Sequence, residues 1–395
     1  MQTKYVTSLL DDKNIPGTLR NLLETKEPCL ILFKVSGVIN LSKRLWIGND
    51  NFVVDGSSAP GPVIITGNMF YVRASNMMFR YLTIIGNRND IDIDACWILL
   101  CHNIIFEYCT IMLGSDEVLS ITKCDDIIIK NCIIANPFHD NKHAFGTILS
   151  GSDDHSTIWF INNLMANCSS RNPSFGTGNF YVANNYIYNY GHRASYTSNT
   201  RDSVCVMINN YYKSGPDTSR HNVIFNMPNE SSAVTVFLHN NYIEGYPEQT
   251  EDNSLAVTKK ENGQLLDIDK RGKLKIVPKK DIYLTKHERF KIYRRLDKII
   301  RHNLIHKNTT SNEYFEGCKD YTFLSNVGNN INDVYWTKKI LDDVKHNTST
   351  KILDPIDVSI HETHTNIDPP INIYNYVDMT NCVIDIDKCI SELKS

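Results

Sequence analysis

Two aspartates, Asp94 and Asp116, have a spacing that could support chemistry. They lie 22 residues apart, and a similar interval recurs elsewhere in the chain. If this interval is one coil of a stacked structure, the two carboxylates lie on adjacent rungs, about 5 Å apart. Carboxylates at that separation can share one hard divalent cation. The alternative is that both are solvated turn residues.

The eleven cysteines do not indicate a reactive or metal-binding site. Their odd number argues against a closed disulfide framework, and no pair has the Cys-x-x-Cys spacing of structural zinc sites. We therefore interpret them as buried free thiols.

β-Strands are the elements that would position the two aspartates. Short runs rich in Val, Ile, Phe and Tyr follow one another through the first 245 residues, separated by Asn, Asp, Gly and Ser. No helical pattern separates them, which argues against an alternating βαβ fold. One early helix is predicted at Leu19–Leu23. The predicted strands are Cys29–Phe33, Val63–Thr66, Met78–Ile85, Ile104–Met112, Asp126–Ala135, Thr157–Leu164, Asn179–Tyr188, Val204–Tyr212 and Ala233–Tyr242.

A repeat runs through these strands. Asn-Asn pairs occur at 162–163, 184–185, 209–210 and 240–241, at spacings of 22, 25 and 31 residues, and Tyr108-Cys109 and Asn131-Cys132 are earlier equivalents. A coil of this length cannot bury its own apolar face and must stack on its neighbours. Asparagines at equivalent turns can then form amide ladders. Because propeller blades need about 40–50 residues, the period favours a parallel β-helix.

The C-terminal part of the chain has a different character. A basic tract at 259–301 holds 15 Lys and Arg against 6 Asp and Glu, although the net charge of the chain is −3. Because a capping box at 285–288 opens a helical pattern there, we expect a helix with a solvated basic face and no nucleic-acid partner. Further helical segments are predicted at Thr337–Val344 and Cys389–Leu393. We expect 247–395 to fold back on a β-helix domain of residues 1–246 and to protect its open edge.

Membrane and export signals are not evident. No run of 18 apolar residues is present, so no transmembrane helix is predicted. The first residues lack a basic segment followed by an apolar one, as a signal peptide would have. We therefore expect a cytoplasmic or virion-associated protein, or a secreted one if the gene start is truncated.

Short motifs follow one another in a fixed order. They are Pro16–Arg20, Ile31–Leu41, Asp55–Gly61, Arg80–Leu82, Lys142–Gly146, Asn163–Asn167, Arg171–Pro173 and Asn184–Gly191, and they lie within a matching stretch of roughly residues 5–216. In type and order they resemble the opening and middle of the pectate lyase-like proteins of polysaccharide lyase family one. The resemblance implies an all-β fold, a right-handed single-stranded parallel β-helix of the pectin lyase type, with a partly helical C-terminal extension.

The same resemblance implies a lyase that cleaves a uronate-containing, acidic polysaccharide by β-elimination. That reaction needs a base at C5 and cations on the adjacent carboxylate. Family members usually place Ca²⁺ there. Asp94 and Asp116 correspond to the first two acidic ligands of this calcium ion, and Ser120 stands where a third is expected. Glu117 should point to the opposite face if the backbone is extended.

The remaining site residues are basic. Arg171 corresponds to the proton-abstracting arginine of the family, and a bidentate clamp on a carboxylate is its alternative role. His143 stands where a substrate-binding lysine is expected, with Lys142 beside it, and a histidine can also serve as a base. We predict all three as catalytic residues. His192 and Arg193 are predicted to extend the groove as substrate-binding residues, the alternative being solvated loop positions.

Two other functions are compatible with such a fold. Ser120 in place of an acid, and Gly176 where a second arginine is common, favour a β-helix that binds glycans without cleaving them, such as a virion or surface protein. A β-helix glycoside hydrolase would need paired carboxylates, but the pairs at 125–126 and 153–154 should point to opposite faces. Only β-elimination leaves an ultraviolet-absorbing unsaturated sugar.

Overall fold

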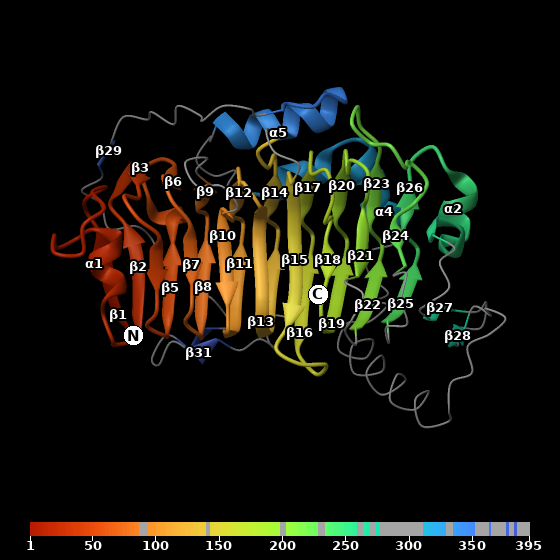
Figure 1. Ribbon diagram of the computed structural model, residues 1–395. Helices are drawn as coiled ribbons and strands as arrows, with labels where there is room; N and C mark the ends of the chain where they lie inside the picture. The colour runs from red at the N-terminus through yellow and green to blue at the C-terminus, as the bar shows by residue number, and fades with distance from the viewer. Residues whose placement is uncertain are drawn as a thin grey trace.

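The computed structural model describes residues 1–86, 93–139, 143–197, 203–227, 234–258, 311–328 and 335–351, with short strands at 264–268, 274–276, 363–364, 377–378 and 383–384. Coils of β-strand are stacked along one axis, and the two ends of the stack are far apart (Figure 1). Each strand pairs in parallel with its equivalent in the next coil. This arrangement is a parallel β-helix, which confirms the predicted fold class.

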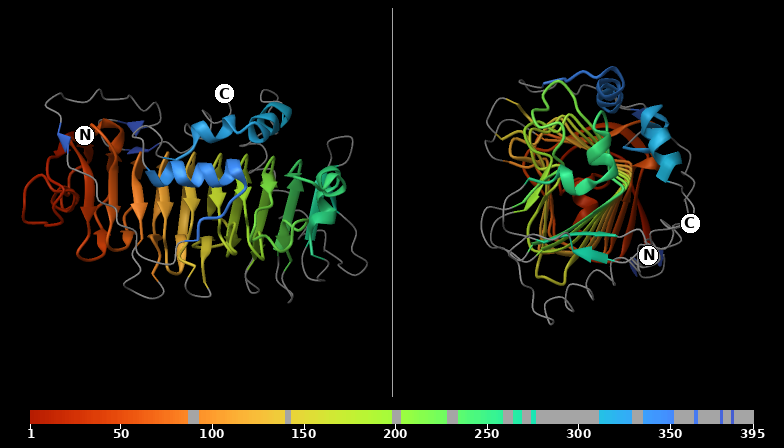
Figure 2. Two further views of the ribbon diagram at one scale, coloured as in Figure 1. Left: turned by 90° about the horizontal axis from the view of Figure 1, so that it is seen from above. Right: turned by 90° about the vertical axis from the view of Figure 1, so that its right-hand side faces the viewer.

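Three parallel sheets form the walls of the coil, seen end-on in Figure 2. The first sheet contains β1 (Gln2–Val6), β2 (Cys29–Phe33), β5 (Phe52–Asp55), β8 (Met77–Arg80), β11 (His102–Glu107), β13 (Glu117–Lys130), β16 (Thr157–Ile161), β19 (Gly178–Ala183), β22 (Ser203–Ile208), β25 (Val234–His239) and β27 (Gln264–Ile268), with β28 (Leu274–Ile276) antiparallel to β27. The second sheet contains β3 (Val35–Asn40), β6 (Val63–Thr66), β9 (Thr83–Ile85), β12 (Thr110–Met112), β14 (Ile133–Ala135), β17 (Leu164–Ala166), β20 (Tyr186–Tyr188), β23 (Tyr211–Lys213) and β26 (Tyr242–Ile243), with β29 (Thr363–His364) antiparallel to β3. The third sheet contains β4 (Leu45–Ile47), β7 (Phe70–Val72), β10 (Cys96–Leu99), the first part of β13, β15 (Phe145–Gly151), β18 (Ser174–Phe175), β21 (Ser195–Thr197) and β24 (Phe225–Asn226). A separate pair joins β30 (Val377–Asp378) to β31 (Val383–Ile384).

Most of the long strands predicted from the sequence are two strands joined by a sharp bend. The run predicted at Thr157–Leu164, for example, is divided between β16 and β17. The first asparagine of each Asn-Asn pair has a positive φ, between 52° and 56°. Asparagine adopts this left-handed conformation more readily than most residues, and it turns the chain from the first sheet into the second. The prediction of one continuous strand was wrong because a run of apolar residues does not reveal a single left-handed residue.

The second asparagine of each pair forms the predicted amide ladder. The side chains of Asn163, Asn185, Asn210 and Asn241 are fully buried. Each Nδ2 donates to the Oδ1 of the next, at distances of 3.1, 2.9 and 2.9 Å, and Asn241 continues the ladder to Asn253. Since a buried amide without a partner costs about 1–3 kcal/mol, the ladder stabilises this register of the coils.

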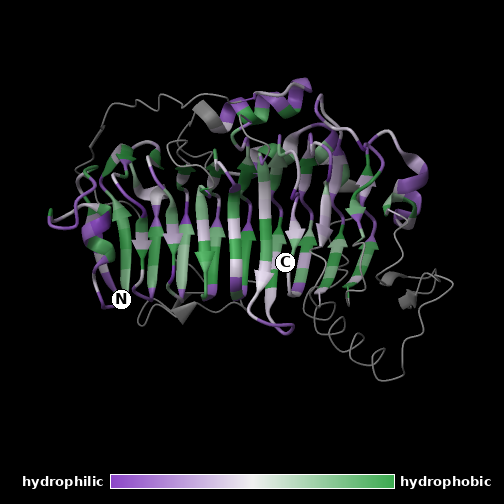
Figure 3. Ribbon diagram, viewed as in Figure 1, coloured by the Kyte–Doolittle hydropathy of each residue, from purple (hydrophilic) through white to green (hydrophobic). Residues whose placement is uncertain are grey.

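The interior of the coil is a continuous apolar core. Its strands are largely hydrophobic and its bends hydrophilic (Figure 3). All nine cysteines among the described residues are free and buried, as predicted.

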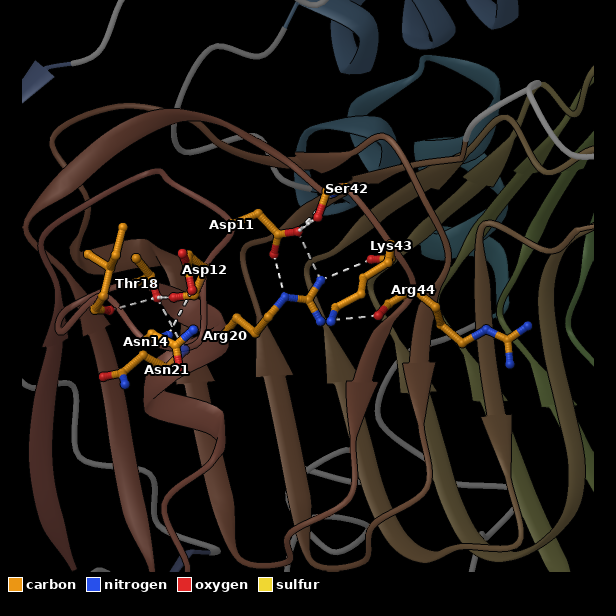
Figure 4. A network of polar contacts seen from close by, with 10 residues as sticks. Asp11, Asp12, Asn14, Thr18, Arg20, Asn21, Ser42, Lys43 and Arg44 are labelled. Carbon is orange, nitrogen blue, oxygen red and sulfur yellow. Dashed lines mark hydrogen bonds and ion pairs between the residues drawn. The ribbon is translucent and has the colours of Figure 1, made fainter.

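The N-terminal end carries α1 (Leu19–Leu23), as predicted, with Thr18 as its N-cap. The buried Arg20 bonds Asp11 and also donates to the backbone carbonyls of Lys43 and Arg44, at 2.9 and 3.1 Å (Figure 4). These bonds hold the turn that precedes β4. A short helix, η1 (Gly56–Ser58), follows β5.

The C-terminal segments take two positions. α2 (Pro247–Glu251) and η2 (Asn253–Ala256) lie at the far end of the stack (Figure 1). In contrast, α4 (Ser311–Lys319), η3 (Thr322–Asn326) and α5 (Tyr335–His346) lie along the side of the coil, where their apolar residues pack against outward side chains of the second sheet (Figure 2). α5 confirms the helix predicted at Thr337–Val344. α4 and α5 lie along the side because the second sheet carries a second apolar face that these helices bury. The expectation that the extension protects the open edge stays a prediction.

Polar bonds fix the side-packed helices to the β-helix. Lys213 of β23 donates to the Tyr321 hydroxyl and to the Val344 carbonyl, at 2.9 and 3.0 Å. The buried Asp343 of α5 accepts hydrogen bonds from Thr348 and Thr350.

The predicted domain boundary at 246 does not end the first sheet, because β27 pairs with β25. The helices predicted at 285–304 and 389–393, and most of the basic tract, lie outside the described residues.

Among the described residues, no helix has the length and apolar character required to cross a membrane.

Candidate functional site

The predicted site residues gather where strands of the third sheet begin. Asp94 precedes β10, Glu117 opens β13, and Arg171 precedes β18. Pairing of Cys96 with Leu119 puts successive coils 23 residues apart at this point, and Glu117 pairs with Phe145 one coil further on. A bridge from Phe145 to Ser170 then reaches the rung of Arg171. Residues distant in sequence therefore form one short row across neighbouring coils.

Three carboxylates form the centre of this site. One oxygen from each of Asp94, Asp116 and Glu117 lies within 4.8 Å of the others. The Glu117 amide donates to Oδ1 of Asp94 at 3.0 Å. The expectation that Glu117 points to the face opposite to Asp116 was wrong. Asp116 lies in the bend before β13, where the alternation of side chains along a strand does not hold. Extending the strand pairing places Glu117 opposite Asp94. The cluster contains only oxygen donors, as a hard divalent cation requires.

Burial and repulsion make this cluster receptive to positive charge. The pKa of Asp94 is raised to about 7, chiefly by burial and also by the nearby Asp116 carboxylate, although a hydrogen bond with the Ser120 hydroxyl and the charge of Arg171 act to lower it. Ser120 is itself buried and lies against Asp94. The predicted third ligand is thus within the site, but as a hydrogen-bond partner of the first.

Arg171 provides a fixed positive charge beside the acids. Its guanidinium forms an ion pair with Glu117 and lies over the Phe145 ring, 4.2 Å from the centroid. The residue has a φ of 62°, and its carbonyl accepts from the Thr147 amide at 2.7 Å. Because the backbone is held in this left-handed turn, the side chain is directed across the row toward the carboxylates.

His143 completes the cluster beside Phe145. Its Nδ1 lies 3.0 Å from Oδ1 of Asp116, and its ring stacks on Phe145 at a centroid distance of 5.0 Å. Phe145 thus supports both basic side chains. Phe145 was not predicted as a site residue, since an aromatic residue in a strand is usually a packing residue. Lys142 lies outside the described residues.

No protein-family model matches the chain. A probable pectate lyase C from Aspergillus terreus is 30% identical over 251 residues, covering 62% of this chain and 54% of that protein. The corresponding protein from Emericella nidulans is 28% identical over 270 residues, covering 67% and 61%. The fold is shared with a variant pectate lyase from Xanthomonas campestris, at a TM-score of 0.50 and 10% identity, covering 85% of this chain and 96% of that one. In sequence, the chain is therefore similar to pectate lyases. It spans between about half and three-fifths of the length of these two relatives.

The two remaining predicted residues, His192 and Arg193, lie one rung beyond Arg171. Pairing of Ser174 with Tyr196 places Arg193 in register with Arg171. The Arg193 guanidinium lies 3.9 Å from the centroid of the Tyr196 ring, and its Nε donates to Ser170 at 3.1 Å. The pKa of His192 is lowered by partial burial of its ring and by the positive charges of Arg193 and Arg220. Arg193 thus carries the row of basic side chains one rung away from the acids, whereas the lowered pKa of His192 favours its neutral form.

Proposed function

We propose that this chain is a polysaccharide lyase of the pectate lyase type, which cleaves a uronate-containing polymer by β-elimination. The proposal rests on three carboxylates gathered beside an arginine, on a β-helix whose relatives are named pectate lyases. In this reaction the C5 proton is removed and negative charge builds up on the adjacent carboxylate. The site supplies positive charge and proton-accepting groups within one short row.

Calcium is the cofactor that suits this donor set. Asp94, Asp116 and Glu117 would hold the ion, with Ser120 supporting Asp94 through its hydroxyl. The third acid, which the sequence pattern placed at Ser120, is supplied instead by Glu117. When bound, Ca²⁺ would supply positive charge to the substrate carboxylate and stabilise the charge that develops there.

Arg171 is the catalytic residue of this proposal. In the free protein its guanidinium pairs with the Glu117 carboxylate, and a uronate carboxylate offers it the same kind of partner. The family resemblance gives Arg171 the role of base at C5. Its contact with Phe145 and its fixed backbone keep the guanidinium in one position for either role.

His143 is proposed as a second catalytic group. Its ring is oriented by Asp116 and by stacking on Phe145, as a base or a substrate-binding residue requires. Lys142 is adjacent in sequence and stays a predicted catalytic residue. Arg193 and His192 would bind sugar units on the next rung.

The test is the ultraviolet absorbance of unsaturated product from polygalacturonate, pectin and alginate, with added Ca²⁺ or with chelator. We expect activity on at least one substrate, its loss in Arg171→Ala and Glu117→Gln, and its loss with chelator. His155→Ala is a matched control for His143→Ala, because His155 is an exposed histidine beside Asp154 and lies beyond the far end of β15, the strand that Phe145 opens.

A folded wild-type protein that produces no unsaturated sugar from any of the three polymers would refute the lyase proposal. Retained binding of these polymers under the same conditions would then support a glycan-binding β-helix. Activity that persists in Arg171→Ala would exclude the role given to this arginine.

A further inference from the structure

A row of residues at one register position runs along the third sheet, with one residue in each coil. The row is Trp46, Tyr71, Trp97, Ser120, Ile148, Ser174 and Tyr196. Ser120, in the middle of the row, is the residue whose hydroxyl bonds Asp94. The row therefore passes directly beside the acid cluster and continues toward the N-terminal end of the β-helix.

The N-terminal part of this row is an aromatic ladder, formed by Trp46, Tyr71 and Trp97. Ring centroids lie 5.1 Å apart between Trp46 and Tyr71, and 5.2 Å apart between Tyr71 and Trp97. The Trp97 indole is fixed by a bond to the Thr122 hydroxyl at 2.7 Å. The side chain of Trp46 is 53% exposed, whereas that of Tyr71 is buried. A large aromatic side chain left this open to solvent on a rigid sheet is typical of a binding surface.

Two exposed arginines accompany the aromatic ladder. The Arg44 guanidinium lies 4.9 Å from the Tyr71 centroid, and that of Arg73 lies 5.6 Å from the Trp46 centroid. The backbone carbonyl of Arg44 is held by Arg20, while its side chain extends away from that network (Figure 4). Trp46 and the two guanidinium groups thus share one surface, and the buried Tyr71 supports them from beneath. Arginine binds carboxylates in a bidentate manner.

We propose that the aromatic ladder, with Arg44 and Arg73, forms distal subsites for the same uronate polymer. This inference rests on the proposed function, because it assigns the polymer that the acid cluster would cleave. From Trp46 to Ser120 there are three strand spacings, about 14 Å. A short oligosaccharide held at the acids cannot also reach Trp46, whereas a long polymer contacts both.

The chemistry of the surface specifies an acidic sugar chain. A pyranose ring presents a face of C–H groups, which packs on an aromatic ring, and its hydroxyls remain in water. Uronate carboxylates at the edge of each ring would meet Arg44 or Arg73. A neutral polymer would use the rings alone and bind more weakly.

The experiment measures retardation of the full chain in native gels containing polygalacturonate, in an Arg171→Ala background that prevents turnover. We expect Trp46→Ala to weaken binding about tenfold, the loss of one ring contact. Leu255→Ala is the matched control, because Leu255 is also 53% exposed but belongs to η2 at the far end. Arg73→Gln should weaken binding to polygalacturonate and leave binding to a neutral galactan unchanged.

The subsite proposal is overturned if the parent protein is not retarded, or if Trp46→Ala and Leu255→Ala bind equally. A Trp46→Ala protein with a lower melting temperature and unchanged affinity would show a purely structural ladder, which also overturns it. Lyase activity in the wild type combined with any of these results leaves the proposed function intact. Trp46-dependent retardation without lyase activity would support the subsites and refute the lyase.

Discussion

The Asn ladder gives the most quantitative prediction of stability. Asn185 is fully buried, and its Nδ2 donates to the Phe160 carbonyl and to Asn210 Oδ1, both at 2.9 Å. Its Oδ1 accepts from the amide and from Nδ2 of Asn163, at 2.8 and 3.1 Å. Asn185→Ala removes these four bonds and leaves their partners buried. At about 1 kcal/mol for each bond, we expect a loss of about 4 kcal/mol in the free energy of unfolding.

The assay is urea-induced unfolding followed by circular dichroism, with the midpoint and the slope compared between variants. Asn184→Gly is the matched control: it changes the neighbouring asparagine, whose φ is 54°, a conformation that glycine adopts without strain. We expect this control to change stability by less than about 1 kcal/mol. If Asn185→Ala costs no more than Asn184→Gly at an unchanged slope, the ladder does not stabilise the stacking of the coils.

Three further predictions concern pH, metal and thiols. Although burial acts to raise it, hydrogen bonds from Lys351, Ser349 and Asn189 hold the pKa of Asp217 at about 2. This depressed value stabilises the fold above the ordinary carboxyl pKa, and the contribution is lost as pH falls from about 4 toward 2. Asp217→Asn should therefore flatten the dependence of the melting temperature on pH in that interval, and a slope equal to that of the wild type would contradict the assignment. Glu117→Gln should weaken calcium binding in calorimetry, whereas Asp153→Asn, which alters a carboxylate outside the cluster, should leave it unchanged; equal affinities in the two variants would exclude Glu117 as a ligand. Because the described cysteines are free and buried, a thiol reagent should leave them unmodified in the native protein, and reductant should not shift the melting temperature. Rapid labelling of any of them without denaturant would show that the coil opens.

Local sequence was sufficient for the repeating part of the fold. The period of the Asn-Asn pairs predicts stacked coils, because a coil this short must bury its apolar face against a neighbour. The predicted amide ladder was confirmed at Asn163 and its equivalents. Predictions at Leu19–Leu23 and Thr337–Val344 were confirmed because caps and helical periodicity are local signals.

The register between coils was decided only by the tertiary structure. The coils differ in length, with spacings of 22, 25 and 31 residues between the Asn-Asn pairs. Counting one coil of 22 residues therefore placed Asp116 opposite Asp94, whereas the strand pairing, with a spacing of 23 residues, places Glu117 there. The bend before β13 then brought both acids to the same side, which strand alternation alone does not predict. Phe145 became part of the site for a similar reason, since only the stacking of the next coil brings Arg171 to the ring on which His143 stacks.

The sequence by itself therefore determined the architecture and the types of residue available for chemistry. The tertiary structure decided which of these residues meet, and that α4 and α5 cover the side of the β-helix. The physical reason is that periodicity and capping act over a few neighbouring residues. Contacts between coils depend instead on the geometry of the bends and on the register between coils of unequal length. Both are fixed only when the strands pair and the core packs.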